Sequence, residues 1–269
     1  MFETLYDDLK QSRLFFLIAG PCVIEDESLM LRIAENLKEI TSKRNIPLVF
    51  KASFQKANRT SNQSFQGPGI HKGLEILSKI KSEFNLPILT DVHETTDVQL
   101  VSEICDIIQI PAFLSRQTPL IKAAAKSGKI INIKKGQFMA PEDMLKASEK
   151  VTSADNCKVL LTERGTSFGY HNLVVDFRSF YILNSFSFPV VYDVTHSLQK
   201  PSESDFSGGS PEYVSMMAQA AIATGKVNGL FIETHPEPQK ALSDAASMIP
   251  LITLPDLLDK CMQIKSTLG

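Results

Sequence analysis

The sequence predicts an α/β protein, a single (β/α)8 barrel (TIM barrel) that occupies residues 1–269 as one domain. Short runs of apolar and β-branched residues alternate with longer helix-like segments, and we count eight such runs. The length of 269 residues is close to that of one such barrel. Polar and reactive residues recur where the expected strands end, which is where barrels of this kind carry their active sites.

Each expected strand is a nearly continuous apolar run, as in parallel strands that are buried on both faces. The runs are Phe15–Gly20, Ile46–Ser53, Pro87–His93, Ile107–Ala112, Lys129–Gly136, Lys158–Gly165, Val190–Ser197 and Gly229–Pro236. Successive strand–helix units imply right-handed crossovers and a parallel sheet that closes on itself. A doubly wound open sheet is the alternative fold, but no G-x-G-x-x-G pattern follows the first strand.

The segments between the strands show helical periodicity. Leu29–Lys43, for example, carries leucine or isoleucine at every third or fourth position. Further helices are expected at Gly73–Phe84, Thr96–Cys105, Pro119–Ser127, Pro141–Thr152, Pro211–Thr224 and Leu254–Ser266. Several begin with proline, which suits a first helical turn because its missing N–H is not needed there. Two longer polar segments interrupt the pattern, 55–71 and 199–210, and Ser-Gly-Gly-Ser in the second predicts a mobile loop.

Composition and charge exclude several classes of protein. The formal net charge of -2 provides no general basic field, so neither nucleic acid nor an acidic membrane is an expected partner. The sequence contains no apolar run of about 18 residues, and acidic residues precede the first apolar run, so we expect neither a membrane span nor a signal peptide. The four widely spaced cysteines form no C-x-x-C pair and favour a reducing cytoplasm over a disulfide scaffold.

Basic residues cluster at or just after the expected strand ends: Lys51, Lys56, Arg59, Lys134, Lys135 and Arg164. Cations that are held close together repel unless an anion lies between them, so the cluster indicates a substrate with more than one phosphate or carboxylate. Because neighbours on a strand point to opposite faces, we expect Lys134 to face the barrel mouth and Lys135 to be structural. For any single one of them, a solvated surface charge is the alternative.

A metal site is the second hypothesis. Cys22, His196 and Glu233 end the first, seventh and eighth strands, which are neighbours in a closed barrel. Asp244, in the loop after the last strand, could supply a fourth ligand. A thiolate, an imidazole and two carboxylates suit Zn²⁺, Fe²⁺ or Mn²⁺ and not Mg²⁺. The spacing matches no short metal motif, so the residues alone leave two alternatives open, a buried apolar role for Cys22 and a hydrogen-bonded rim role for His196.

Other residues receive weaker assignments. His93 and His235 are further rim candidates, and a role in fixing a loop is favoured for His235. Asp91 could orient a substrate hydroxyl or a lysine. The remaining cysteines are expected to be packing residues in or beside helices: Cys105, Cys157 and Cys261.

The strand-end motifs, taken together, are specific. They are AGPC (19–22), KASFQKANRTS (51–61), TDVHE (90–94), QIPAFLSRQT (109–118), KKGQFMAPEDM (134–144), TERGTSFGYHNLVVDFRS (162–179), DVTHSLQ (193–199) and ETHPEPQKALSD (233–244). Over nearly its whole length the chain resembles the 3-deoxy-D-manno-octulosonate 8-phosphate synthases, and the KANR string distinguishes that family from its nearest relatives. The resemblance implies condensation of phosphoenolpyruvate with D-arabinose 5-phosphate, a step in the synthesis of lipopolysaccharide precursors.

The resemblance also implies roles for individual residues. Lys51 and Lys56 would hold the carboxylate region of phosphoenolpyruvate. Its phosphate would be held by Lys134, Arg164 and the backbone N–H of Ala112. The arabinose phosphate would be gripped across a subunit boundary, which implies a homo-oligomer, usually a tetramer, by Asn58, Arg59 and Thr60. Further residues are assigned to the pocket: Asp91, Gln109 and Gln137.

The family divides into metal-requiring and metal-free branches, and the metal-free branch carries asparagine where this chain has Cys22. The resemblance therefore implies a divalent metal ion (Zn, Fe or Mn) on Cys22, His196, Glu233 and Asp244, with His196 also counted among the catalytic residues. Where many relatives carry glycine after the aspartate, this chain has Ala245. Two alternatives remain: a synthase of 3-deoxy-arabino-heptulosonate 7-phosphate that uses erythrose 4-phosphate, and a non-catalytic sugar-phosphate-binding regulator.

Overall fold

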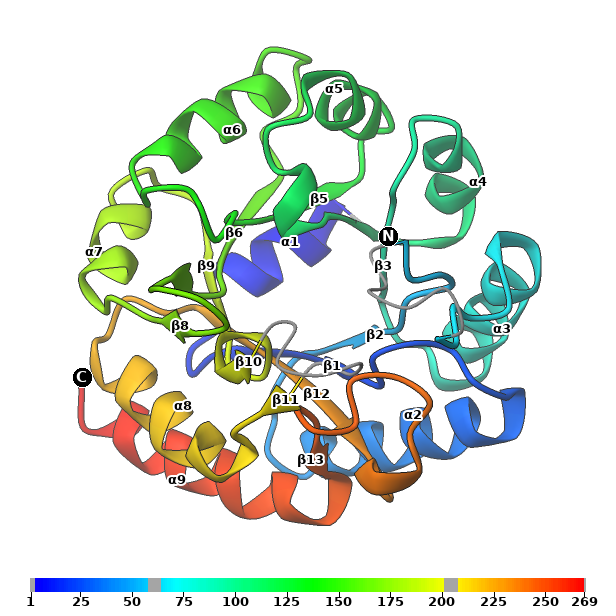
Figure 1. Cartoon of the computed structure of the whole chain (residues 1–269), viewed down its shortest axis with the longest axis vertical. Helices are drawn as coiled ribbons and strands as arrows, with labels where there is room; N and C mark the ends of the chain where they lie inside the picture. Colours follow the sequence, from blue (N-terminus) through cyan, green and yellow to red (C-terminus); the bar gives the residue numbers. More distant parts are fainter. Residues whose placement is uncertain (1–2, 58–63, 201–207, 269) are drawn as a thin grey trace.

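Eight parallel strands form a closed barrel in the computed structural model, which describes residues 3–57, 64–200 and 208–268 (Figure 1). The barrel strands are β1 (Phe16–Gly20), β2 (Leu48–Lys51), β3 (Ile88–Asp91), β4 (Ile107–Ile110), β5 (Ile130–Lys134), β6 (Val159–Glu163), β9 (Val190–Asp193) and β12 (Gly229–His235). Each pairs in parallel with its neighbour, and β1 pairs with β12 to close the ring. The predicted fold class is confirmed, and the strands are mostly shorter than the apolar runs suggested.

Helices surround the barrel on the outside (Figure 1). They are α2 (Glu27–Ser42), α3 (Ile70–Phe84), α4 (Asp97–Ile104), α5 (Thr118–Lys126), α6 (Asp143–Thr152), α7 (Arg178–Asn184), α8 (Val214–Ala223) and α9 (Leu254–Ser266). Helix α2 begins two residues before the expected start because the Asp26 side chain accepts a hydrogen bond from the backbone N–H of Leu29 and caps the helix. Among the described residues, no helix is long and apolar enough to cross a membrane.

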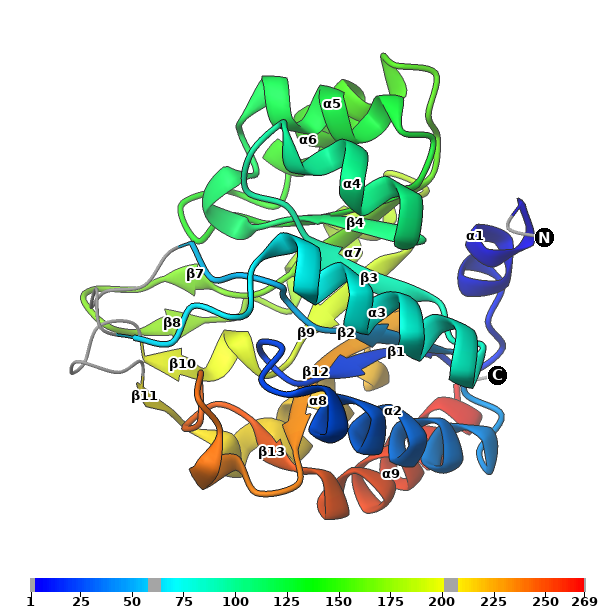
Figure 2. The same ribbon diagram turned by 90° about the vertical axis from the view of Figure 1, so that its right-hand side faces the viewer.

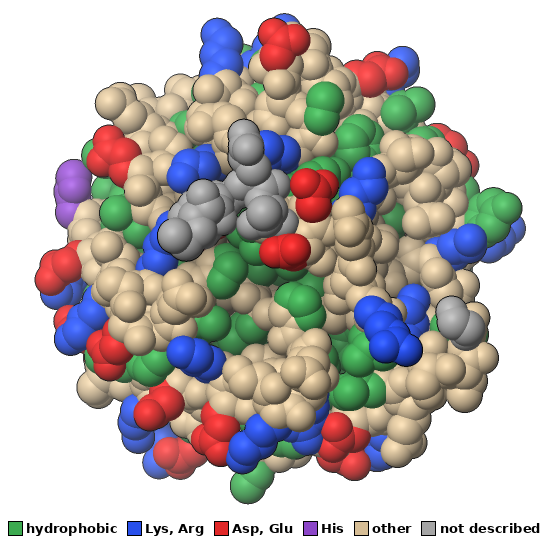
Figure 3. Space-filling view, turned by 180° about the vertical axis from the view of Figure 1, so that it is seen from behind, with side chains coloured by type: hydrophobic (Ala, Val, Ile, Leu, Met, Phe, Trp, Pro, Cys, Tyr) green, Lys and Arg blue, Asp and Glu red, His purple; other side chains and the backbone are tan. Residues whose placement is uncertain are grey.

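Helix α1 (Glu3–Lys10) closes the N-terminal end of the barrel and was not predicted. It is seen behind the barrel centre in Figure 1 and apart from the rest of the fold in Figure 2. Leu9 is 1% exposed and packs with the inward-facing apolar residues of the strands, and the Tyr6 hydroxyl donates to the Val159 carbonyl oxygen at 3.1 Å. The face around α1 carries acidic and basic side chains interspersed (Figure 3). Leu9 and the apolar cluster around it therefore fill the barrel interior at this end.

Replacing Leu9 by alanine is expected to destabilise the protein by about 2–5 kcal/mol, because the barrel floor would keep a cavity. Leu145 on α6 is 37% exposed, so Leu145→Ala is the matched control and should cost well under half as much. Urea unfolding of the two variants measures the difference. An equal loss of unfolding free energy in the two variants would mean that Leu9 stabilises the barrel no more than a partly exposed helix residue does.

Short additional strands follow the C-terminal ends of the barrel strands, at the open end of the barrel (Figure 2). They are β7 (Thr166–Ser167), β8 (Leu173–Val174), β10 (Gln199–Lys200), β11 (Gly208–Gly209) and β13 (Ile249–Pro250). β7 pairs with β8 and β10 with β11, both antiparallel, while β13 extends the barrel sheet beside β12. The expected mobile loop, 199–210, begins and ends in the β10–β11 pair, and its residues 201–207 lie outside the described part of the chain.

Candidate active site at the C-terminal end of the barrel

Alternation along the strands builds the floor and walls of the site. The inward-facing residues are apolar near the strand beginnings and polar two positions later, as in Val49 and Lys51 of β2 or Phe231 and Glu233 of β12. The same step carries Val191 to Asp193 on β9. A packed apolar floor therefore lies directly below a layer of buried charges.

A cavity of about 390 Å³ opens above this layer. Among the residues that the structure describes, four basic ones line the cavity: Lys51, Lys56, Lys134 and Arg164. Also on its walls are Ala57, Asp91, His93, Glu94, Gln109, Pro111, Ala112, Phe113, Leu114, Gln137, His196, Gln199 and Asp244. The volume suits small molecules, and the basic side chains suit anionic ones.

Two of the lysines are anchored by buried carboxylates. Lys51 Nζ lies 2.7 Å from Glu233 Oε1 and donates to the Cys22 carbonyl oxygen at 3.0 Å. Lys134 Nζ lies 2.5 Å from Asp193 Oδ2 and 3.8 Å from the centre of the Phe231 ring. Burial lowers the pKa of Lys134, although Asp193 acts in the opposite direction. These ammonium groups are held in fixed positions before any substrate arrives.

Arg164 and Lys56 complete the basic wall. Arg164 is buried, Nη2 donates to Gln199 Oε1 at 3.0 Å, and Nη1 has no hydrogen-bond partner within the described structure. Burial lowers the pKa of Arg164. Burial also acts to lower the pKa of Lys56, but Cys22, Asp91 and other nearby acidic groups raise it above its ordinary value. A guanidinium nitrogen that is buried and unpaired is suited to an incoming oxyanion.

Asp91 lies at the end of β3 in a dense hydrogen-bond network. It accepts from Ser53 Oγ at 2.5 Å, and its other oxygen lies 3.2 Å from His93 Nε2. Burial acts to raise the pKa of Asp91, but His93 and Lys56 hold it well below its usual range. Burial acts to lower the pKa of His93, and Asp91 raises it overall. Asp91 is therefore a fixed anion on a mostly cationic wall.

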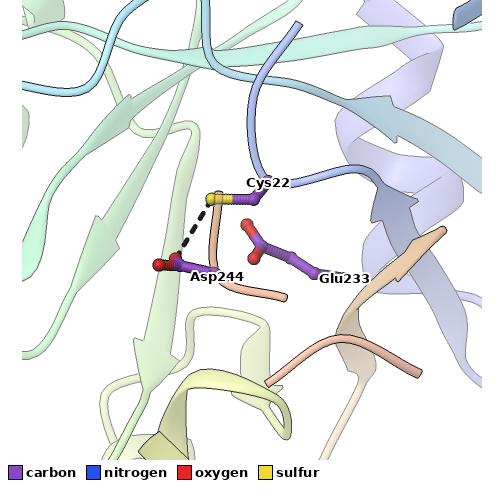
Figure 4. Close-up of side chains that lie close together, drawn as sticks. All are labelled: Cys22, Glu233 and Asp244. Atoms are coloured by element: carbon purple, nitrogen blue, oxygen red, sulfur yellow. Dashed lines mark hydrogen bonds between the residues drawn. The ribbon is translucent and has the colours of Figure 1, made fainter. Parts of the chain in front are cut away.

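A cluster of metal-type ligands adjoins the cavity. Single ligand atoms of Cys22, Glu233 and Asp244 all lie within 4.8 Å of one another (Figure 4). Pairing of β1 with β12, which sets Gly20 opposite Glu233, brings the first two together. His196 Nε2 lies 3.5 Å from Glu233 Oε2 and 3.9 Å from Asp244 Oδ2. Residues from 22 to 244 thus meet at one point of the rim.

Asp193 orients His196. Its Oδ2 lies 2.9 Å from His196 Nδ1, and its Oδ1 accepts from the His196 backbone N–H at 3.0 Å. This contact leaves Nε2 directed at Glu233 and Asp244, the arrangement in which carboxylates orient histidine ligands of metals. The sequence placed Asp193 at a strand end without giving it a role, and its position three residues before His196 was the available signal.

The donor set fits a divalent ion. Glu233 Oε2 is buried and accepts no hydrogen bond within the described structure, which leaves a lone pair for a cation. Burial, with Asp244 and Glu233, raises the pKa of the Cys22 thiol to about 12, so without a cation the thiol is protonated and donates to Asp244 Oδ2 at 3.1 Å. A bound cation would favour the thiolate instead.

Comparison with known proteins agrees with this geometry. Residues 10–268 match the family model described as the DAHP synthetase I family. A 2-dehydro-3-deoxyphosphooctonate aldolase from Dichelobacter nodosus is 53% identical over 94% of this chain and 91% of its own length. The proteins of that name from Trichlorobacter lovleyi and Acidithiobacillus ferrooxidans are 51% and 52% identical over 92% and 91% of this chain, and over 91% and 87% of their own lengths.

The chain belongs to the 2-dehydro-3-deoxyphosphooctonate aldolase family. This is the family that the strand-end motifs indicated, under another of its names, so the resemblance is confirmed. In this chain, most of the predicted site residues line the cavity: Lys51, Lys56, Asp91, Gln109, Ala112, Lys134, Gln137, Arg164, His196 and Asp244. Cys22 and Glu233 adjoin it through Asp244, Lys51 and His196. Asn58, Arg59 and Thr60 lie outside the described residues.

Two lesser expectations, for Lys135 and His235, agree with the structure. Lys135 Nζ turns away from the cavity, donates to Thr166 Oγ1 at 2.9 Å and pairs with Glu163 Oε1 at 3.3 Å, so it fixes the loops after β5 and β6. His235 Nδ1 accepts from the Glu237 backbone N–H at 3.0 Å and so fixes the loop after β12.

The expectation for Cys157 was wrong. Cys105 and Cys261 are buried as predicted, but Cys157 is exposed in the loop between α6 and β6. A position close to a helix in the sequence does not determine whether a side chain is buried.

In the protein without added metal, a thiol reagent is therefore expected to modify one described cysteine rapidly, namely Cys157. The others are buried, and burial raises the pKa of Cys22 and of Cys261 to about 12, which suppresses the reactive thiolate. Counting the modified thiols over time, in the wild type and in Cys157→Ser, checks this. A fast phase that persists in Cys157→Ser would contradict it.

Proposed function

We propose that this protein condenses phosphoenolpyruvate with D-arabinose 5-phosphate and water to give 3-deoxy-D-manno-octulosonate 8-phosphate and inorganic phosphate. The supporting observation is the cavity in which four buried or half-buried cations face the cluster of Cys22, His196, Glu233 and Asp244. Two anionic substrates and a divalent ion account for both halves of the site. Relatives named as aldolases of this product support the same proposal.

The residues around the cavity supply binding and orientation. Lys134, Arg164 and the Ala112 N–H would hold the phosphate of phosphoenolpyruvate, while Lys51 and Lys56 would lie against its carboxylate. C3 of phosphoenolpyruvate forms the new C–C bond to the aldehyde carbon, water adds at C2, and phosphate leaves by C–O cleavage. Fixed cations stabilise the charge that develops on the transferred groups, because they need no reorganisation during the reaction.

A divalent ion (Zn, Fe or Mn) on Cys22, His196, Glu233 and Asp244 would supply Lewis-acid chemistry for the aldehyde or for the attacking water. Asp193 would keep His196 in the tautomer that offers Nε2. Gln109 accepts from Asn132 Nδ2 at 3.1 Å and would present its amide to the substrate, as would Gln137, whose Oε1 is buried and unpaired within the described structure.

Assays with the two aldose phosphates in parallel test the proposal. Phosphate release from phosphoenolpyruvate should require D-arabinose 5-phosphate. A preference for erythrose 4-phosphate would favour the heptulosonate synthase, which the name of the matching family model keeps as the second candidate. No release with either sugar would favour a non-catalytic binding protein.

Arg59→Ala is expected to raise the KM for D-arabinose 5-phosphate by about 10-fold or more, since a charge-assisted phosphate contact contributes about 1.5–3 kcal/mol. The KM for phosphoenolpyruvate should change little. Steady-state kinetics with each substrate varied in turn measures both constants, and equal effects would remove the role that we assign to Arg59.

We also propose a homo-oligomeric, cytoplasmic enzyme, with a tetramer as the expected assembly. Large apolar side chains are exposed at the open end, with Phe168 68% and Tyr170 94% exposed in the loop that joins β7 to β8, and Phe113 57% exposed at the cavity. Such residues are typical of subunit interfaces. Sedimentation of the purified protein measures the assembly.

A further inference from the structure

Gln199 joins the two charged halves of the site. This residue is the first of β10, its Oε1 accepts from Arg164 Nη2 at 3.0 Å, and its Nε2 donates to Asp244 Oδ2 at 3.2 Å. A guanidinium offers only donors and an ionised carboxylate only acceptors. The amide can therefore satisfy both partners in one orientation alone.

We propose that Gln199 is a positioning residue that couples the binding of a phosphate-like dianion at Arg164 to the binding of a divalent cation at Asp244. The inference rests on the proposed function, because it takes Arg164 as an anion ligand and Asp244 as a metal ligand. It assigns to Gln199 a task that neither of those roles requires.

The coupling follows from the donors of Arg164. An oxyanion is expected at Nη1, which is buried and has no hydrogen-bond partner in the described structure, while Nη2 remains on Gln199. Fixing the guanidinium then fixes the amide, and the amide holds Oδ2 of Asp244. Since Oδ2 also lies 3.9 Å from His196 Nε2, the held carboxylate faces the other candidate ligands.

The backbone supports Gln199 from the other side. Gln199 pairs with Gly209 of β11, and a Cβ on Gly209 would lie 2.5 Å from the Ala246 carbonyl oxygen. The β10–β11 pair therefore packs directly against the loop that carries Asp244. A side chain at 209 would push this loop away, so glycine permits the close approach that lets Gln199 reach Asp244.

Direct attraction between a bound anion and a bound cation also produces coupling, so the experiment must separate the two sources. Gln199→Met keeps the length of the side chain and removes both hydrogen bonds. Gln219→Met on α8 is the matched control, because Gln219 Nε2 donates to the Ser215 carbonyl oxygen at 2.9 Å and does not line the cavity. Co²⁺ is a suitable probe, since its thiolate absorption reports Cys22, and sulfate serves as a tetrahedral dianion.

Sulfate should tighten Co²⁺ binding to the wild type by about 5-fold or more, a typical coupling between sites. In Gln199→Met, the affinity for Co²⁺ in the absence of sulfate should fall by about 10-fold, as when the hydrogen-bond partner of a metal ligand is lost. The effect of sulfate should fall at the same time, and Gln219→Met should match the wild type. The same sulfate effect in Gln199→Met as in the wild type, or no effect in the wild type, would overturn the proposal.

Product formation is measured separately in the same preparations. Catalysis without coupling would refute the role of Gln199 and leave the proposed function standing. Coupling without product formation would support the role of Gln199 and refute the proposed function.

Discussion

Cys22→Ala is expected to lose its bound metal, and its kcat is expected to fall by about 100-fold or more. Loss of a residue that only orients a metal ligand costs about 10- to 100-fold, and loss of a ligand itself should cost at least the upper value. The thiol contacts both Ser243 Oγ at 2.9 Å and Asp244 Oδ2 at 3.1 Å, at the centre of the ligand cluster. Its removal leaves an imidazole and two carboxylates, a set that binds Zn²⁺ or Fe²⁺ less tightly without the thiolate.

The fold should survive this substitution, because one small side chain is lost and the barrel below is intact. We expect a change in the free energy of unfolding of about 1 kcal/mol. Cys105→Ala is the control, since Cys105 is also fully buried but is not part of the Cys22, Glu233 and Asp244 cluster. Elemental analysis and kinetics on the two variants decide the matter, and full activity of Cys22→Ala without bound metal would show that the cluster is not a metal site.

The barrel could be predicted because its signal is repeated. Each strand carries the same apolar run, so an error at one strand end changes nothing in the topology. The plug helix α1 carries no such repetition, because its burial depends on Leu9 meeting residues from all around the barrel floor. Helix α7 was not predicted for a related reason, since its seven residues are too few to show a clear helical periodicity.

Part of the site geometry could be predicted in a similar way. Strand ends meet at one rim by topology, which placed Lys51, Lys134 and Glu233 together before any contact was known. The alternation of a strand also separated Lys134 from Lys135 correctly. What the sequence could not supply was the pairing of these charges. The ion pair between Lys51 and Glu233, for example, depends on a short distance in space between residues that are 182 positions apart in the sequence.

Asp193 shows the consequence of such pairing, since several donors surround its carboxylate. Lys134 Nζ, His196 Nδ1 and the His196 backbone N–H converge on its two oxygens. An asparagine has nearly the same shape but must direct two N–H hydrogens at one of these donors. The substitution therefore leaves the buried Lys134 ammonium without its counter-charge.

Asp193→Asn is accordingly expected to lower the free energy of unfolding at pH 7 by about 3 kcal/mol, the lower end for breaking a buried ion pair. It should also weaken metal binding about 10-fold or more, because His196 loses its orienting partner. Asp259→Asn is the control, since Asp259 pairs with Arg44 while its side chain is 51% exposed, and it should cost under about 1 kcal/mol.

The difference in stability between wild type and Asp193→Asn should also depend on pH in a defined direction. Burial acts to raise the pKa of Asp193, but His196 and Lys134 hold it far below its ordinary value in the folded protein. In the unfolded chain the carboxyl titrates near its ordinary pKa of about 3.9. The stabilisation is therefore complete above that pH and is lost as the pH falls through the lower pKa of the folded state. Urea unfolding of both proteins from pH 7 downward should show the difference shrinking below about pH 4, and a difference that instead grows on acidification would mean that Asp193 is not the anion on which Lys134 and His196 depend.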